Sequence, residues 1–289
     1  MLLTLLALIA FAGNSLLCRA ALAHTQIDAA SFTTIRLLSG AVVLFVLVVL
    51  RSGVSSGSVR GAGNWPSALA LFVYAAAFSF AYMQLNTGIG ALILFGAVQT
   101  SMIAYGLWCG ERFAAGQWLG LALACAGLTG LLLPGASAPP LIGALLMIAA
   151  GIAWGVYSLR GKAAGNPLQV TAGNFIRTIP MTLLLSVLLS RQLSVDSSGI
   201  FYALLSGAVT SGVGYAIWYS AVPLIKATTA ATVQLSVPML AALGGVLLLQ
   251  EPLTLRLLLA SLAILGGIAL VVLLPAKAKH KVRSTSARR

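Results

Sequence analysis

Hydrophobic runs of about 20 residues follow one another along almost the whole chain, and no other feature constrains its fold as strongly. A helix rises about 1.5 Å per residue, so each run is long enough to cross roughly 30 Å of hydrocarbon. Only 7% of the residues are charged and 60% are hydrophobic, whereas a soluble protein carries about 25% charged residues. The runs lack the period-two alternation of a membrane β-barrel. The sequence therefore predicts an all-α membrane protein.

Short segments containing glycine, proline or polar residues separate ten such runs, which predicts ten transmembrane helices. The first run could also be a signal peptide, because Ala21, Leu22 and Ala23 resemble a cleavage site. No Lys or Arg precedes that run, however, and it has a counterpart later in the chain, so we expect it to be a span. The predicted spans are residues 2–20, 29–50, 65–85, 88–109, 115–133, 141–159, 168–190, 199–221, 227–249 and 253–274.

A charge-free break at residues 131–140 separates two halves of the chain that resemble each other. Proline and glycine in this break cannot continue a helix. Sliding the second half back by 141 residues, or by 140, superposes residue types that are scarce in this chain. We therefore predict two five-helix repeats, 1–134 and 139–275, followed by a basic cytoplasmic tail at 276–289. The superposed pairs are Arg19 and Arg160, Arg36 and Arg177, Tyr74 and Tyr215, Ser79 and Ser220, Glu111 and Glu251, and Gly127 and Gly267.

The odd number of spans in each repeat determines the architecture. The second repeat must cross the membrane in the opposite orientation to the first, and inverted repeats of this kind recur in secondary transporters, with the substrate site between the halves. We therefore expect two inverted five-helix repeats around a central cavity. Ten spans also place both termini on one side, which carries 12 of the 17 Lys and Arg residues, while the opposite side carries only Arg19, Arg191 and Arg256. The positive-inside rule then predicts cytoplasmic termini, and we expect a multi-pass protein of the plasma membrane, here a bacterial inner membrane.

Motifs at the end of each half resemble a known family. In the second half, Gln234-Leu-Ser-Val-Pro238 precedes Gln250-Glu251-Pro252 and the pair Gly266-Gly267, and the first half has a parallel Gly110-Glu111-Arg112. Together with Arg36 and Arg177, these residues resemble the EamA-type members of the drug/metabolite transporter superfamily, which have ten spans in two inverted halves. One departure is Val98, which stands where the repeat would place the partner of Pro238.

The resemblance implies that the chain exports amino acids or other small metabolites by alternating access, as YddG-like aromatic amino-acid exporters do. It also implies a cavity lined by spans 1, 3, 4, 6, 8 and 9, with spans 5 and 10 at the periphery. The alternatives are a multidrug or other metabolite efflux carrier and a channel. We expect no enzymatic activity, because no HExxH motif occurs and both histidines lie outside the spans.

The expected partners are a small-molecule substrate and the lipid bilayer. The net charge of +13 does not indicate nucleic-acid binding, because the basic residues lie mostly in loops and the tail, where they orient membrane proteins. The three cysteines have no metal-ligand spacing, and we expect no metal and no cofactor. Whether the chain forms a homodimer stays open.

Aromatic side chains on three spans are candidates for the cavity wall. Tyr74, Phe78 and Tyr82 recur every four residues and so share one helical face, and the repeat pairs the first two with Tyr215 and Tyr219. Such opposed faces would suit an apolar or aromatic substrate, although ordinary core packing explains the same pattern. The candidate aromatic residues are Tyr74, Phe78, Tyr82, Trp154, Tyr157, Tyr215, Trp218 and Tyr219.

Polar residues inside apolar spans are the second group of candidates. Amides in hydrocarbon need partners, so Asn14, Gln99 and Gln234 are expected to contact either another helix or a ligand. Arg36 and Arg177 either bond to helix carbonyls or headgroups, or bind a substrate carboxylate.

Two prolines and the placement of the acids complete the set of candidates. Pro180 and Pro238 are candidate hinges, because proline kinks a helix. All four acidic residues lie at or beyond span ends, which favours a facilitator or weakly coupled carrier for zwitterions or neutral organic molecules, although aromatic walls could also hold a cationic drug.

Overall fold

The computed structural model describes residues 2–52, 62–135, 138–161, 166–221, 224–225 and 227–274. Within these ranges ten helical spans are long and apolar enough to cross a membrane, as predicted. Eight of the ten are single helices. These are α1 (Leu2–His24), α2 (Ala29–Ser52), α4 (Trp65–Tyr82), α5 (Thr87–Trp108), α6 (Ala115–Leu132), α7 (Leu141–Gly161), α8 (Pro167–Leu188) and α13 (Leu255–Leu273).

The remaining two spans are divided. The eighth span runs through α9 (Ser197–Leu204), a π-helical stretch η2 (Leu205–Val213) and α10 (Gly214–Ala221), after a short 3₁₀ turn η1 (Ser190–Gln192). The ninth span comprises α11 (Ala227–Gln234) and α12 (Ser236–Leu249), with a break at Leu235. Pro238 explains this break, because it has no N–H to donate to the carbonyl four residues earlier. Leu235 N donates instead to Thr232 O at 3.1 Å, as in a 3₁₀ turn.

Local sequence signals set several helix starts. Asn64 caps α4, since its side-chain oxygen accepts a hydrogen bond from Ser67 N at 2.9 Å. Asn166 caps α8 in the same way, and a proline follows each of these caps within two residues, where its fixed φ suits the first turn. Pro180 lies within α8, which continues through it as a single helix. Its predicted hinge role stays a prediction.

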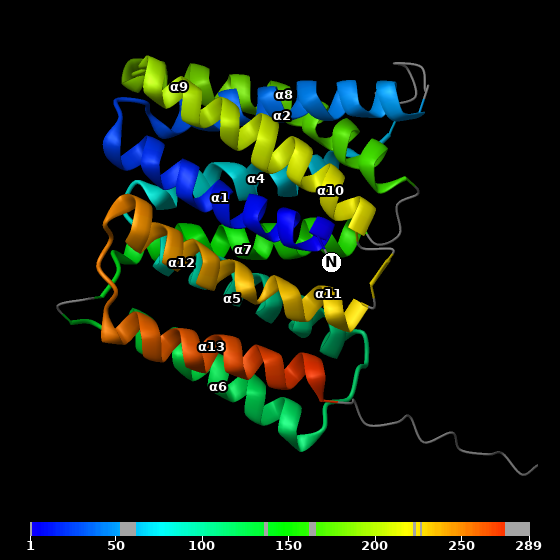
Figure 1. Ribbon diagram of the computed structural model, residues 1–289, viewed down its shortest axis with the longest axis vertical. Helices are drawn as coiled ribbons and strands as arrows, with labels where there is room; N and C mark the ends of the chain where they lie inside the picture. Colours follow the sequence, from blue (N-terminus) through cyan, green and yellow to red (C-terminus); the bar gives the residue numbers. More distant parts are fainter. Residues whose placement is uncertain are drawn as a thin grey trace, which may run out of the picture.

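The helices run alongside one another across the bundle, with α2, α8 and α9 along one edge and α6 and α13 along the opposite edge (Figure 1). The start of α1 and the end of α13 lie at the same end of the bundle, as an even number of spans requires (Figure 1). We call this the open end, because the central cavity reaches it. The other end, where α1 turns into α2 and α4 into α5, is called the closed end.

Several of the main helix contacts recur when each helix is replaced by its predicted counterpart in the other half. The α4–α7 contact corresponds to that between α1 and α10, and the α5–α7 contact to that between α1 and α12. The α2–α8 and α6–α13 pairs correspond to themselves. This is the pattern expected of two similar halves related by a twofold exchange, and it keeps α6 and α13 away from the centre.

Small residues allow the peripheral pair α6 and α13 to pack closely. A Cβ atom added at Gly120 would lie 2.5 Å from the carbonyl oxygen of Gly267, and one at Gly127 would lie 2.7 Å from the Cβ of Ala263. Close backbone approach through small residues is typical of helix pairs in membranes. The contact therefore depends on glycine at these positions.

Candidate functional site

A cavity of about 490 Å³ lies between the two halves, a volume typical of small-molecule sites. Its walls come from α1, α4, α5, α7, α8, the eighth span and α11. It extends from the middle of the bundle to the open end, where Asn64 at the start of α4, Arg160 at the end of α7 and Pro167 at the start of α8 line it. None of the described residues that line it belongs to the closed end.

Stacked and tilted aromatic rings form much of the wall. Trp154 of α7 is at the centre of this group: its ring lies 5.5 Å from that of Tyr215, at an interplanar angle of 17°, and 4.8 Å from that of Tyr74. Tyr219 continues the stack, 6.4 Å from Tyr215. Tyr74 and Tyr215, which the repeat superposes, therefore flank the same indole ring.

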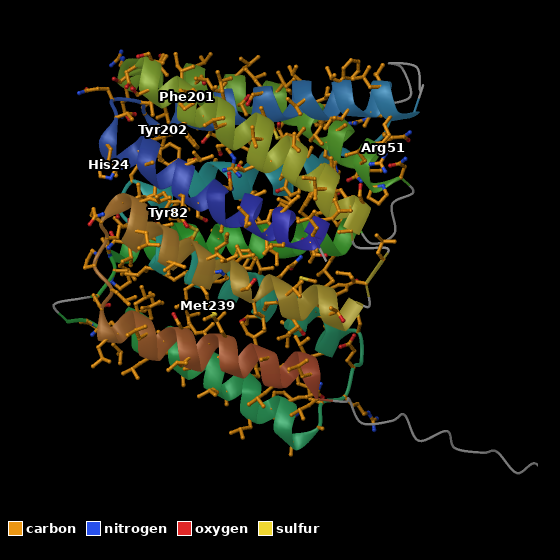
Figure 2. The ribbon with its side chains drawn as sticks, in the orientation of Figure 1. His24, Arg51, Tyr82, Phe201, Tyr202 and Met239 are labelled. Carbon is orange, nitrogen blue, oxygen red and sulfur yellow. The ribbon has the colours of Figure 1, made fainter. Side chains whose placement is uncertain are left out.

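Ten of the eleven residues predicted to bind substrate line this cavity. Tyr82 is the exception and does not line it. Its side chain is fully buried, its ring packs edge-on against Phe78 at 4.7 Å, and its hydroxyl donates to Thr87 O at 3.3 Å. Figure 2 shows Tyr82 toward the same end as His24, away from Arg51. The lining residues that were predicted are Asn14, Tyr74, Phe78, Gln99, Trp154, Tyr157, Tyr215, Trp218, Tyr219 and Gln234.

A buried hydrogen-bond network connects the two halves at the inner end of the cavity. Asn14 Oδ1 accepts a hydrogen bond from Ser206 Oγ at 2.7 Å and lies 3.3 Å from Thr210 Oγ1. Asn14 Nδ2 donates to the hydroxyl of Tyr74 at 3.4 Å. Sequence reasoning missed Ser206 and Thr210, because hydroxyl residues also satisfy themselves within a helix, as Thr210 does by donating to Ser206 O at 2.8 Å.

Arg36 lies directly behind this network and is only 2% exposed. Its Nη2 donates to the Tyr74 hydroxyl at 3.2 Å, and its guanidinium carbon lies 4.9 Å from the centre of the Phe78 ring. In the described part of the chain, its Nε and Nη1 have no hydrogen-bond partner. Arg177 differs from its counterpart, because its Nη1 donates to the carbonyls of Ala62 and Gly173. Neither arginine lines the cavity itself.

The two repeat-related Arg–Glu pairs also differ. At the closed end, Arg19 forms an ion pair with Glu251 at 3.2 Å and donates to Tyr82 O at 2.9 Å. At the open end, Arg160 donates to Ser67 Oγ at 3.1 Å and not to Glu111. The closed end is therefore held by a charged contact that the open end lacks among the described residues.

The described residues offer no cluster suited to a metal ion. No group of three or more His, Cys, Asp or Glu side chains occurs among them. Cys18 is buried, Cys109 and Cys125 are exposed, and all three are free. The described part of the cavity wall also contains no Asp or Glu.

A bundle of ten membrane-spanning helices around a central cavity has the form of a multi-pass membrane transporter. The model of the EamA-like transporter family matches residues 141–273. An uncharacterized protein of Pseudomonas aeruginosa is 58% identical over 272 residues, which cover 94% of each chain. An uncharacterized transporter of Archaeoglobus fulgidus is 26% identical over 204 residues, covering 69% of this chain and 73% of that one. Residues 141–273 of the chain therefore form an EamA-like transporter family domain, as the motifs indicated.

The fold also has a counterpart among solved structures. One crystal structure of a protein superposes with a TM-score of 0.66 and covers 94% of this chain and 97% of its own. At 19% sequence identity this likeness shows the fold alone.

Proposed function

We propose that this transporter exports small metabolites, chiefly aromatic and apolar amino acids, across the bacterial inner membrane. The observation that carries this proposal is the cavity wall, where Trp154 is flanked by Tyr74 and Tyr215. Such rings bury an apolar or aromatic side chain of the substrate. The amides of Asn14, Gln99 and Gln234 offer hydrogen bonds to the polar groups of the substrate.

Alternating access fits the asymmetry between the two ends of the bundle. The cavity opens at one end, while the Arg19–Glu251 ion pair holds the other. Because the repeat superposes Arg160 on Arg19 and Glu111 on Glu251, an equivalent ion pair could form at the open end when the closed end separates. Two inverted halves that exchange conformations would produce this second state.

The direction of the cavity follows from the distribution of charge. The open end carries the start of α1 (Figure 1) and Arg51 (Figure 2), and α5, which Arg112 follows in the sequence, also ends there. If this basic end faces the cytoplasm, as the positive-inside rule indicates, the structure represents an inward-facing state that is ready to receive a metabolite from the cell.

Exchange of labelled phenylalanine in proteoliposomes tests the proposal. A carrier gives saturable uptake that is accelerated by unlabelled substrate on the opposite side, whereas a channel gives no such counterflow. We expect Tyr215→Ala and Tyr74→Ala to reduce exchange at least about tenfold, because each loses contact area with the substrate worth more than 1.4 kcal/mol.

Tyr202→Ala is the matched control, because Tyr202 belongs to the same span as Tyr215 but is not among the residues that line the cavity. This variant should retain exchange. Equal loss of folded protein in the Tyr74 and Tyr215 variants would indicate that these rings serve packing alone. Wild-type liposomes without saturable exchange of any amino acid would contradict the proposed function.

A further inference from the structure

The Tyr74 hydroxyl at the inner end of the cavity accepts two hydrogen bonds and has a proton left to donate. Arg36 Nη2 lies 3.2 Å and Asn14 Nδ2 lies 3.4 Å from its oxygen. A guanidinium can only donate, and a phenol oxygen has two lone pairs and one O–H group. We find no acceptor for that proton in the described part of the chain, and Tyr74 lines the cavity. The hydroxyl is therefore available as a donor to a ligand.

The Asn14 amide is oriented between Ser206 and Tyr74. The Ser206 hydroxyl donates to the carbonyl oxygen of Asn14 at 2.7 Å. The amide nitrogen points toward Tyr74, 3.4 Å from the phenol oxygen. With this orientation, Asn14 cannot accept the Tyr74 proton.

The positive charge of Arg36 has no carboxylate partner in the described part of the chain, where Arg19–Glu251 is the only ion pair. The rings of Phe78 and Tyr74, at 4.9 and 5.5 Å from its guanidinium carbon, provide partial compensation. A buried charge in a membrane protein normally requires a partner or a wet cavity. An anionic group bound at the Tyr74 hydroxyl would supply the opposite charge.

We infer that the cavity recognises the carboxylate of its substrate through the Tyr74 hydroxyl, and that Arg36 acts behind Tyr74 as a positioning residue. This inference rests on the proposed function and names the recognised group. Because the described cavity wall contains no Asp or Glu, the substrate ammonium has no charged partner there. The transporter then accepts aromatic carboxylates with or without an α-amino group, and discriminates against the corresponding amines.

Three ligands of matched size test this inference by isothermal titration calorimetry on the full-length protein in nanodiscs. Phenylalanine carries both charged groups, 3-phenylpropionate lacks the ammonium, and phenethylamine lacks the carboxylate. We expect the first two to bind with affinities within about fivefold of each other. Phenethylamine should bind at least about tenfold more weakly, because it forgoes a hydrogen bond to a charged group.

Tyr74→Phe removes the hydroxyl, which is both the donor to the ligand and the acceptor for Arg36 and Asn14, and keeps the ring against Trp154. It should weaken 3-phenylpropionate by about 10- to 100-fold and leave phenethylamine unchanged. Arg36→Gln should reduce the same preference for acid over amine, while Tyr202→Phe, outside the cavity, should preserve it. If Arg36→Gln fails to fold, Tyr74→Phe decides the question.

Two results would overturn the inference and leave the proposed function intact: phenethylamine binding as tightly as phenylalanine, or Tyr74→Phe weakening all three ligands equally. Absence of binding by all three ligands, together with absence of amino-acid exchange, would overturn the proposed function as well.

Discussion

At the scale of single residues, the side chain of Asn14 links the two halves of the protein through hydrogen bonds. Its amide joins Tyr74 of the first half to Ser206 and Thr210 of the second, and it is only 7% exposed. Polar side chains in an apolar bundle are stabilised by such bonds between helices. Asn14 therefore both fastens the two halves and orients the hydroxyl that faces the cavity.

Replacement of Asn14 by Leu should lower the free energy of unfolding by about 1–2 kcal/mol, because it removes the hydrogen bonds to Ser206 and Tyr74. Thermal or denaturant unfolding of the purified protein measures this change. Gln26→Leu, at an exposed amide, is the control and should stay within about 0.5 kcal/mol of the wild type. An Asn14→Leu variant as stable as the wild type would show that the network contributes nothing.

Sequence reasoning identified ten of the residues that line the cavity but could not assign their partners. Amide and aromatic side chains are easily recognised in an apolar sequence. Ser206 is not, because its role depends on Asn14 of α1, which only the structure places beside it. Tyr82 lies on the same helical face as Tyr74 and Phe78, but it is nearer the closed end, beside Arg19. The cavity does not extend that far, so the shared helical face alone did not predict which residues line it. For Arg36 and Arg177 the sequence left two readings open. The structure gives Arg177 backbone carbonyls as partners, whereas Arg36 has a phenol and ring faces.

At the scale of elements, α6 and α13 depend on a contact between backbones. Gly267 faces Gly120 and Ala124, whereas the adjacent Gly266 has nothing within 4 Å of where its Cβ would lie. The two neighbouring glycines thus have opposite surroundings on one helix. Replacing each glycine by alanine therefore separates two contributions to the free energy of unfolding, namely packing against α6 and the helix propensity of alanine.

We expect Gly267→Ala to destabilise the protein by about 1–3 kcal/mol, because the added methyl group overpacks the contact with α6. Gly266→Ala should be neutral or stabilising by up to about 1 kcal/mol, because alanine is the better helix former. The free energy of unfolding in detergent measures both effects. Equal destabilisation by the two substitutions would argue against close packing of α6 and α13.

The positions and lengths of the spans were predictable, but their internal irregularities were only partly so. Pro238 marked a kink, and the ninth span breaks three residues before it, while α5 runs unbroken past Val98. The π-helical stretch Leu205–Val213 had no comparable signal. Its wider turn depends on packing against α1 and α2, which no local pattern encodes.

At the scale of the whole molecule, the two halves share a turn at the end of their fourth spans. Glu111 N donates to Gly106 O and Glu251 N donates to Gly245 O, each at 3.0 Å. In both places a carboxylate oxygen lies within 2.6 Å of the position that a Cβ on the glycine would take. The two glutamates are thus structural counterparts, although only Glu251 has an arginine partner among the described residues.

A cysteine pair replacing Glu111 and Arg160 should be bridged by a bis-methanethiosulfonate cross-linker long enough to replace the two side chains, and exchange should stop, because the proposed alternating access brings these positions together when the open end closes. A reductant should restore exchange. The measurement is gel mobility and labelled-substrate exchange, in a background with the three native cysteines replaced by serine. Arg19→Cys with Glu251→Cys is the control and should cross-link in the state described here. A control pair that cross-links while the 111/160 pair never does would contradict alternating access.

The two halves are not identical, and the broken ninth span has a consequence for energetics. A carrier made of two identical halves would populate its two orientations equally, with the same apparent affinity on each face of the bilayer. The repeat aligns Pro238 of the second half with Val98 of the first half. Arg36 and Arg177 are aligned in the same way but have different partners. One orientation of the carrier is therefore favoured over the other. Such a bias cannot set the net direction of flux, which the gradients across the membrane determine, but it makes the apparent affinities at the two membrane faces unequal.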